Sequence, residues 1–360
     1  MSEYYDEVIL GLNGVVYAKG EAYKRLLRLL SDKDQAPTDY QPIYEVHGEA
    51  VPSLREILWI NSYTYVGITT DGDLFSFLNG DNVHLESPIV SAYVGDSYTE
   101  RLLVVLLENG RLRVVYVDIR GSLLNVNRSD IDQEIPQDIV LLSPVNNNPT
   151  FDSTRKAGVQ YSRFFLAVTT DNEVAMIMID YQREEDNEGI TIYPQVDDPY
   201  KAYLRIIDYI DNNLNLDYRD IKMIRSGYIL LNDGRIYNVT RDVDDLFILQ
   251  EYNHKANDVI DLLIQANQSP VLLSESGSVY YEDRIIYQST DTDKPIKFLH
   301  HYHINEGERH ITYDKSIIVQ GLDGGIYKID LNGNTTEILP ANNMLSYMGR
   351  TTKPHRPAVH

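Results

Sequence analysis

The chain has 360 residues, of which 43% are apolar and 24% are charged, and this composition is ordinary for a globular protein with a sizeable core. It contains no cysteine, which excludes disulfide frameworks, zinc–thiolate sites and thiol nucleophiles. The formal net charge of −22 predicts repulsion from nucleic-acid phosphates and anionic lipid, and it favours a protein partner with a basic surface. An alternative interpretation is that the charge only keeps the protein in solution.

The first residues, Met1 to Glu7, are acidic and lack the charged and then apolar pattern of a secretory leader. No stretch reaches the roughly 18 uninterrupted apolar residues of a membrane span. We therefore expect an intracellular protein, cytoplasmic or nuclear, that is neither secreted nor inserted in a membrane. Residues 1–348 are predicted to form one domain. Residues 349–360 are basic and aperiodic, and they are predicted to form a disordered tail.

One unit recurs along the chain: an alternating apolar run, a two-residue turn, and a second alternating run that often contains tyrosine. Turns of this kind between apolar runs are a strong hairpin signal, and they are expected to have positive φ at both central residues. Successive turns are 38 to 62 residues apart, and the shorter intervals match the ~40–50 residues of a four-stranded propeller blade. The seven turns are Asn13-Gly14, Asp71-Gly72, Asn109-Gly110, Asp171-Asn172, Asp233-Gly234, Ser276-Gly277 and Asp323-Gly324.

Each unit has room for two more strands. Inner strands are predicted at 56–60, 89–93, 139–142, 221–224, 259–262 and 296–299, and outer strands at 246–249, 284–287 and 336–339. The first unit lacks an inner strand, and the spare segment 344–347 is predicted to supply it and to close the ring. The predicted fold is thus an all-β, seven-bladed β-propeller of four-stranded antiparallel blades.

Residues 221–237 contain an inner strand, a hairpin with Asp233-Gly234, and the pair Ile236-Tyr237. This arrangement resembles the repeat of the regulator-of-chromosome-condensation family of seven-bladed propellers. The resemblance implies the propeller fold and, as that family's founding function, nucleotide exchange on a small GTPase. No functional residue of that family is carried over to this sequence.

Three insertions are predicted to project from one face of the disc, at 146–160, 182–189 and 301–314. Elaborated loops on a rigid scaffold often carry function, although neutral insertions also collect at loop tips. The candidate interaction residues in these loops are Asn147, Phe151, Arg155, Glu184, Glu185, His301, His303 and Arg309.

Two insertions are predicted on the opposite face. Residues 31–52 are predicted to form a polar loop. Residues 198–212 are predicted to form a helix that starts at Asp198-Pro199 and has an apolar stripe for packing on the propeller or, alternatively, for docking a partner. The stripe consists of Tyr203, Ile206, Ile207 and Ile210.

The sequence contains no catalytic motif, and we predict no catalytic residue, cofactor or metal ligand. His301 and His303 would share one face of a strand and could form a metal pair, but a solvated histidine-rich loop is the favoured interpretation. Asp291 and Asp293 are candidates for calcium, but they lack the glycine and distal glutamate of a calcium loop.

These observations favour a non-catalytic protein-interaction scaffold or a subunit of a larger assembly, a viral particle included. A guanine-nucleotide exchange factor is one alternative, and it rests on the resemblance. A propeller enzyme of glycosidase or lyase type, with its site in the central channel, is the other. The predicted inner strands are mostly apolar apart from Lys222, Asp261 and Lys297, which argues against the channel enzyme. The oligomeric state is not predicted.

Overall fold

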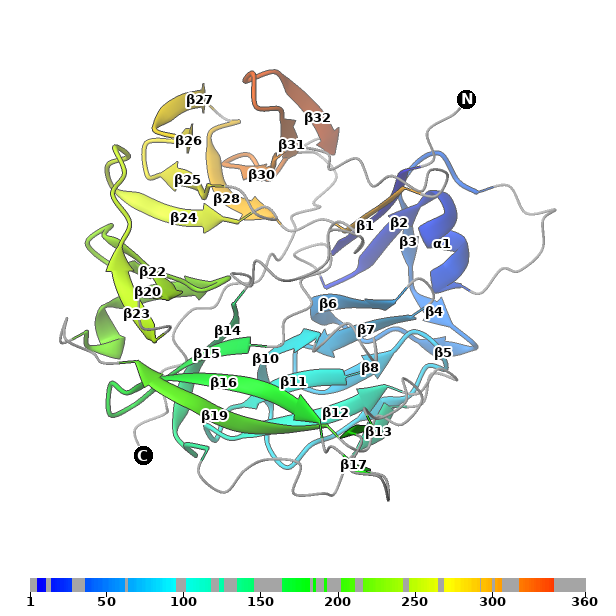
Figure 1. Cartoon of the computed structure of the whole chain (residues 1–360). Helices are drawn as coiled ribbons and strands as arrows, with labels where there is room; N and C mark the ends of the chain where they lie inside the picture. Colours follow the sequence, from blue (N-terminus) through cyan, green and yellow to red (C-terminus); the bar gives the residue numbers. More distant parts are fainter. Residues whose placement is uncertain are drawn as a thin grey trace.

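The structure is a computed structural model. It describes residues 5–10, 14–27, 36–61, 64–94, 102–117, 123–125, 135–145, 164–181, 184–185, 191–192, 202–210, 216–241, 246–264, 269–291, 293–299, 302–305 and 317–339. Within these residues the chain is an all-β propeller whose four-stranded antiparallel sheets stand around a central axis, with one α-helix, α1 (Gly20–Leu26) (Figure 1).

Six of the sheets are built in the same way, with an inner strand followed by three more strands in chain order. The first three are β6–β9 (Leu54–Asn61, Thr64–Thr69, Leu74–Ser76, Asn82–Val83), β10–β13 (Ile89–Val94, Leu102–Leu107, Leu112–Val117, Leu123–Asn125) and β14, β15, β16, β19 (Ile139–Pro144, Phe164–Thr169, Val174–Tyr181, Ala202–Ile210). The other three are β20–β23 (Ile221–Arg225, Tyr228–Leu231, Ile236–Arg241, Phe247–Glu251), β24–β27 (Val259–Leu263, Val271–Ser274, Ser278–Tyr281, Arg284–Gln288) and β28, β30, β31, β32 (Pro295–Leu299, Ile317–Gly321, Ile326–Ile329, Thr335–Leu339). These bounds confirm the predicted inner and outer strands.

A further four-stranded sheet joins distant parts of the chain in the order β29, β1, β2, β3. Its strands are Tyr302–Asn305, Tyr5–Leu10, Val16–Lys19 and Gln41–Ile43. The strand at the inner edge of β1 is therefore β29, which arises inside the insertion between β28 and β30. The prediction that the C-terminal segment 344–347 fills this edge is wrong, because the edge is already paired; 344–347 itself lies outside the described residues.

The hairpin turns have one residue with positive φ rather than two. In β7–β8, for example, the Gly72 amide donates to the Thr69 carbonyl (3.0 Å) and the Thr69 amide donates to the Asp73 carbonyl (2.9 Å), and only Gly72 is left-handed, with φ +89°. This pattern is a type I turn followed by a left-handed residue, which forms a three-residue hairpin loop. The expectation of two left-handed residues is wrong because the extra loop residue already supplies the required twist.

Three of the turns also join their sheet to the next one. The carbonyl of Gly14 accepts from the Leu54 amide (2.9 Å), that of Gly72 from Ile89 (2.9 Å), and that of Gly110 from Ile139 (3.0 Å). A Cβ atom at Gly72 would lie 2.6 Å from the Pro88 side chain and 2.9 Å from the Ile89 amide nitrogen. These turns need glycine for its conformation and also for the close approach of the neighbouring sheet.

The apolar core lies in the seams between neighbouring sheets. Most clusters of buried side chains draw on two adjacent sheets, as where Val104 and Leu106 of β11 pack with Leu142 of β14 and Phe165 of β15. One cluster joins three sheets. In it Val8 of the sheet β29-β1-β2-β3, which we call the composite sheet, packs with Leu54 of the β6–β9 sheet and with Ile318 of the β28 sheet. Burial of apolar side chains between neighbouring sheets therefore holds the sheets together.

The segment predicted as a helix at 198–212 is a strand. β19 pairs with β16 over its whole length, with an irregularity in register between Ile206 and Asp208. Leu204 and Ile206 pack into one seam, and Ile207 and Ile210 pack into the next. Both faces of the strand are therefore apolar, and the bulge breaks the two-residue period, so the spacing imitates that of a helix. Asp198 and Pro199 lie outside the described residues.

The region 31–52 was predicted as a polar loop, but it contains β3 and a small hairpin of β4 (Glu45–Val46) and β5 (Glu49–Ala50). Ile43 and Val46 are buried in the core, which explains why this region is ordered into strands. Helix α1, which the sequence analysis did not predict, precedes it and buries Ala22 and Leu26. Another small hairpin, of β17 (Glu184–Glu185) and β18 (Thr191–Ile192), lies within and just beyond the predicted loop 182–189.

Candidate functional site

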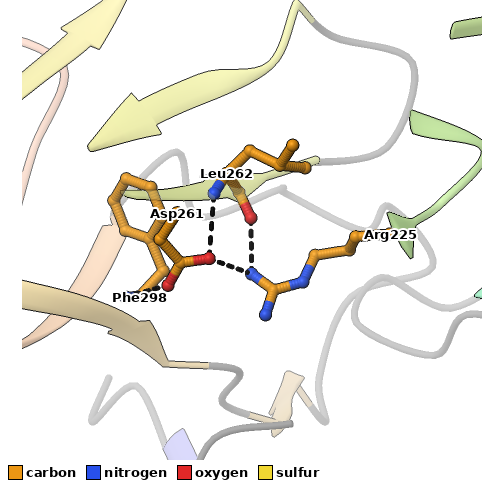
Figure 2. A network of polar contacts seen from close by, with 4 residues as sticks. All are labelled: Arg225, Asp261, Leu262 and Phe298. Carbon is orange, nitrogen blue, oxygen red and sulfur yellow. Dashed lines mark hydrogen bonds and ion pairs between the residues drawn. The ribbon is translucent and has the colours of Figure 1, made fainter. Parts of the chain in front are cut away.

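The inner strands carry a buried ion pair that links three sheets. Arg225, at the end of β20, donates from Nη1 to Asp261 Oδ1 of β24 (3.0 Å) and to the Leu262 carbonyl (Figure 2). Asp261 Oδ1 also accepts from the Leu262 amide (2.8 Å), and its Oδ2 accepts from the Phe298 amide of β28 (2.8 Å). Both charged side chains are only 6% exposed. Asp261 thus bonds three donors from three neighbouring sheets.

Similar contacts continue along the ring through β10, β14 and β20. The Tyr93 hydroxyl donates to the Leu142 carbonyl (2.6 Å), and the Ser226 amide donates to Ser143 Oγ (2.8 Å). Lys222 Nζ donates to the Val259 carbonyl (3.3 Å). Every one of these bonds crosses from one sheet to the next. The polar residues of these inner strands therefore fix the blades relative to one another, and Asp261, with both oxygens engaged, is held as a structural carboxylate.

Arg55 on β6 differs from the other inner-strand cations. Its Nε and Nη2 atoms are buried and have no hydrogen-bond partner among the described residues, and the same is true of Ser91 Oγ on the neighbouring β10. Burial lowers the pKa of Arg55, while the nearby carboxylates of Glu56 and Glu108 act in the opposite direction. Glu56 follows it on β6 and Glu108 follows β11 of the neighbouring sheet, so acids of both sheets favour the charged form of Arg55.

The turns and the residues that directly precede the inner strands form one face of the disc, which we call the link face. Their backbones are bonded together there, as where the Glu108 amide donates to the Pro88 carbonyl (2.8 Å) and the Asn232 amide to the Asp220 carbonyl (2.8 Å). Carboxylates dominate the exposed residues of this face: Asp71, Glu108, Asp171, Glu173, Asp220, Asp233, Asp258, Glu275 and Asp291. The exposed bases on the same segments are Arg111, Arg219 and Arg235.

Two of these bases are already paired with local acids. Arg235 Nε lies 2.8 Å from Asp233 Oδ2, and Arg219 Nη1 lies 3.7 Å from Asp217 Oδ2. The Arg235 amide and guanidinium hold the pKa of Asp233 below its usual range. Asp233 is therefore ionised at neutral pH, and the exposed carboxylates of the link face outnumber its exposed bases.

Two aspartate–tyrosine pairs lie near the seam between β24–β27 and the β28 sheet. The Tyr287 hydroxyl donates to Asp293 Oδ2 (2.7 Å), and the Tyr327 hydroxyl donates to Asp323 Oδ2 (2.6 Å). Hydrogen bonds from Ser289 and Tyr287 lower the pKa of Asp293, whereas burial and then the bond to Asp323 raise the pKa of Tyr327. Within the described residues no group of three or more His, Asp or Glu side chains could hold a metal ion.

The predicted loop residues are only partly within the described structure. Asn147, Phe151, Arg155, His301 and Arg309 lie outside the described residues, as does the tail 349–360. Glu184 and Glu185 form β17, and His303 lies in β29, opposite Glu7. The turn residues from Asp71 to Gly324 lie on the link face; Gly14 belongs to the corresponding turn of β1–β2, and Asn13 lies outside the described part.

The sequence analysis missed Arg225, Ser143 and Arg55 as residues of interest. The position after the bulge of the inner strands gave no signal for them: it is polar in four sheets, as Glu56, Ser91, Asp261 and Lys297, and apolar in two, as Leu141 and Met223. Arg225, Ser143 and Arg55 all lie at other positions of their strands. The partner Arg225 lies on a different strand, so only the folded ring shows the pairing.

No model of a protein family matches the chain, and no curated protein matches it. No helix in the described part of the chain is both long enough and apolar enough to cross a membrane.

Several solved structures are similar to this chain at low sequence identity. PorZ, described as a surface component of the type-IX secretion system of Porphyromonas gingivalis, is 11% identical with a TM-score of 0.44; the match covers 94% of this chain and 38% of PorZ. Prp20p from Saccharomyces cerevisiae, whose structure was described with its binding to Gsp1p and histones, is 12% identical with a TM-score of 0.43, covering 94% of this chain and 87% of Prp20p. The WD40 propeller domain of Doa1 is 13% identical with a TM-score of 0.42, covering 90% of this chain and 88% of that one. The architecture given above rests on the strand pairing of this chain itself.

Proposed function

We propose that the protein is a non-catalytic interaction scaffold that binds a partner through its acidic link face. The observation that carries the proposal is the ring of exposed carboxylates there, together with the scarcity of unpaired bases on the same segments. The inner-strand bonds around Asp261 support it, since they hold the blades in fixed positions and so present the carboxylates as a pre-organised surface. The proposal includes a role as one subunit of a larger assembly.

The partner that fits this face has a basic surface. Complementary charge accelerates encounter and fixes orientation more than it adds affinity, and exposed pairs contribute only about 0.2–1 kcal/mol each. Tight binding therefore needs several pairs at once, or apolar contacts as well. Leu322, which is 62% exposed and lies in the turn between β30 and β31, is an apolar side chain available on the same face.

We also propose that the composite sheet β29-β1-β2-β3 is the seventh blade and closes the ring. The pairing of β29 with β1 and the packing of Val8 and Leu10 with Ile318 and Ile326 support this count. Closure protects the inner edge of β1, which would otherwise be left open to other strands.

The test is affinity capture from the native source with three tagged forms of the protein, read out by mass spectrometry. The link-face variant carries Glu108→Gln, Asp220→Asn, Asp258→Asn and Glu275→Gln. The matched control neutralises the same number of exposed acids elsewhere, at Glu45, Glu49, Asp81 and Glu282. A third form lacks residues 147–158 of the predicted loop on the opposite face.

We expect the link-face variant to lose a partner that both the control and the trimmed form retain, with an affinity that falls steeply as salt rises. Loss of the partner only on loop trimming would move the binding site to the opposite face. Equal losses from the two sets of four substitutions would show that overall charge, and not this face, governs binding. Capture of the same partners by all three variants would reject both faces.

A further inference from the structure

The chain leaves β32 on the link face. β32 begins at Thr335, after the turn that joins it to β31, and it ends at Leu339, whose backbone lies opposite Ile326. Ile326 directly follows the turn 322–325, which belongs to the link face. The two ends of β32 therefore lie on opposite faces of the disc. Residues 340–360 start on the face that carries the exposed carboxylates.

These residues differ in composition from the rest of the chain. The stretch 340–360 contains no aspartate or glutamate, although such acids make up 54 of the 360 residues of the chain. An apolar part, from Met344 to Met348, comes first, and the bases Arg350, Lys353 and Arg356 follow it. A segment of this kind is complementary to a surface that presents apolar side chains next to carboxylates.

The β28 sheet presents exposed apolar side chains at its link-face end. The Leu322 amide donates to the Lys294 carbonyl (2.8 Å), so the turn 322–325 lies against the segment that precedes β28. Leu322 is 62% exposed, and Ile296, the second residue of β28, is 37% exposed. Both are large apolar residues that the described part of the chain leaves accessible to solvent.

Exposed carboxylates lie on the same and on the adjoining segments. A Cβ atom at Gly277 would lie 2.5 Å from the Ser289 carbonyl oxygen and 2.6 Å from Lys294 Cγ, so the turn of β25 and β26 lies beside the segment before β28. The acids Glu275 and Asp291 of these segments are exposed, whereas the base Lys294 is half-buried. The following four residues are called the Leu322 patch: Glu275, Asp291, Ile296 and Leu322.

From this complementarity we propose that residues 344–356 bind the Leu322 patch of their own chain and compete there with the basic partner. The competition rests on the proposed function, because the partner that is displaced is the one that binds the link face. A tethered segment has an effective concentration in roughly the millimolar range, so weak ion pairs and apolar contacts are sufficient for it to occupy the patch. Partner binding then requires displacement of the segment.

The tether alone does not select a face. The connection from Leu339 to Thr352 can extend over roughly 40 Å, at about 3.3 Å per residue. β32, by contrast, has five residues and is only about 17 Å long. A segment that binds nothing therefore reaches both faces of the β28 sheet, and a preference for one face measures binding.

The absence of cysteine allows this preference to be measured in the whole 360-residue chain. Two double variants carry Thr352→Cys together with either Thr290→Cys, exposed on the link face, or Asn332→Cys, exposed in the turn on the opposite face. Equilibration with reduced and oxidised glutathione, read out by mass spectrometry, gives the effective concentration of each pair of thiols. At low salt we expect it to be about fivefold higher for the link-face pair, and high salt should remove the difference.

Charge variants of the Thr290 and Thr352 double variant identify the contacts. One variant replaces the three bases of the segment: Arg350→Gln, Lys353→Gln and Arg356→Gln. A second combines Glu275→Gln with Asp291→Asn, and its matched control combines Glu45→Gln with Glu49→Gln, which are exposed acids of another sheet. We expect the first two variants to lose the preference for the link face and the control to keep it.

Two results would overturn the proposal. One is an equal effective concentration for the link-face and opposite-face thiol pairs at low salt. The other is a preference for the link face that survives both the loss of the three bases and the loss of the two acids, because complementary charge would then not place the segment there.

Affinity capture separates this proposal from the proposed function. If both hold, the variant without the three bases captures more of the partner than the unmodified chain does, and the link-face variant captures less. Equal thiol pairs together with loss of the partner from the link-face variant would reject the docking of the segment alone. A link-face thiol preference together with a partner that the link-face variant retains would uphold the docking and reject the competition.

Discussion

Replacing Asp261 with alanine tests whether the inner strands are held together by their buried polar contacts. The substitution leaves the Arg225 guanidinium, 6% exposed, without its carboxylate, and it also leaves the amides of Leu262 and Phe298 without their acceptors. Removing one partner of a buried ion pair costs about 3–5 kcal/mol. Since whole domains are stable by only about 5–15 kcal/mol, we expect a loss of that size to lower the midpoint of unfolding strongly.

Two companion variants divide this loss into its parts. Asp261→Asn keeps an oxygen acceptor for the backbone amides but removes the charge, and it should cost less than the alanine change. Arg225→Met combined with Asp261→Ala also removes the cation that the alanine change leaves unpaired, and it should recover part of the loss. The three variants therefore separate the charge from the hydrogen bonds.

The assay is equilibrium unfolding in urea at neutral pH, followed both by circular dichroism and by the fluorescence of Trp59, the single tryptophan of the chain. Agreement between the two signals would allow one free energy to be assigned to each variant. The reasoning is refuted if Asp261→Ala costs less than about 1 kcal/mol, the size of an ordinary surface change. A double variant no more stable than the single alanine variant would likewise remove the role given to the buried charge.

Three further predictions concern the turns, the ring closure and an acid–phenol pair. Gly72→Ala should destabilise the protein more than Gly324→Ala, because both glycines have positive φ but only at Gly72 would a Cβ meet neighbouring atoms. The difference between the two losses in urea unfolding measures the steric cost of that Cβ, and equal losses would contradict the prediction. Deletion of residues 344–360 should leave the unfolding midpoint unchanged, because β29 already fills the edge of β1, and a large drop would show that the C-terminal segment contributes to closure. The pKa of Tyr327 is raised in the folded state by burial and by Asp323. The stability that the neutral Tyr327 hydroxyl contributes is therefore fully present below the unfolded tyrosine pKa of about 10, and it is lost as pH rises through the higher folded pKa. Absorbance titration of tyrosinate in the native protein should show this late-titrating group, and Asp323→Asn should shift it to lower pH; an unchanged titration curve would contradict the assignment.

The local signals of the sequence were sufficient for most of the strands. The alternation of apolar residues around Asp71-Gly72 and Asp233-Gly234 predicts hairpins there, and the structure has them at these positions. Turn residues and a two-residue period act over a few residues of chain, so they can be recognised without knowledge of the fold. The same signals predicted the repeated four-stranded sheet and hence the propeller class.

Where a segment packs on both faces, the sequence alone was misleading. Ile206 and Ile207 are adjacent in β19 and face different seams, as successive residues of a strand do, but the bulge beside them places Ile207 and Ile210, three residues apart, in the same seam. Helical spacing was the natural interpretation of this pattern. The segment is a strand because it pairs with the outer edge of β16 along its whole length. Secondary structure in such a segment depends on its neighbours in space more than on its own residues.

Long-range pairing was decided entirely by tertiary structure. The inner edge of β1 needed a strand, and the sequence could show that need, but both 344–347 and 302–305 could have supplied it. The four pairs that join β29 to β1 connect positions about 300 residues apart, and backbone pairing leaves no mark in either sequence segment. The partnership of Arg225 with Asp261 is of the same kind: each residue is visible as a charge near an apolar strand, and only the packing of two neighbouring sheets brings the charges to 3.0 Å.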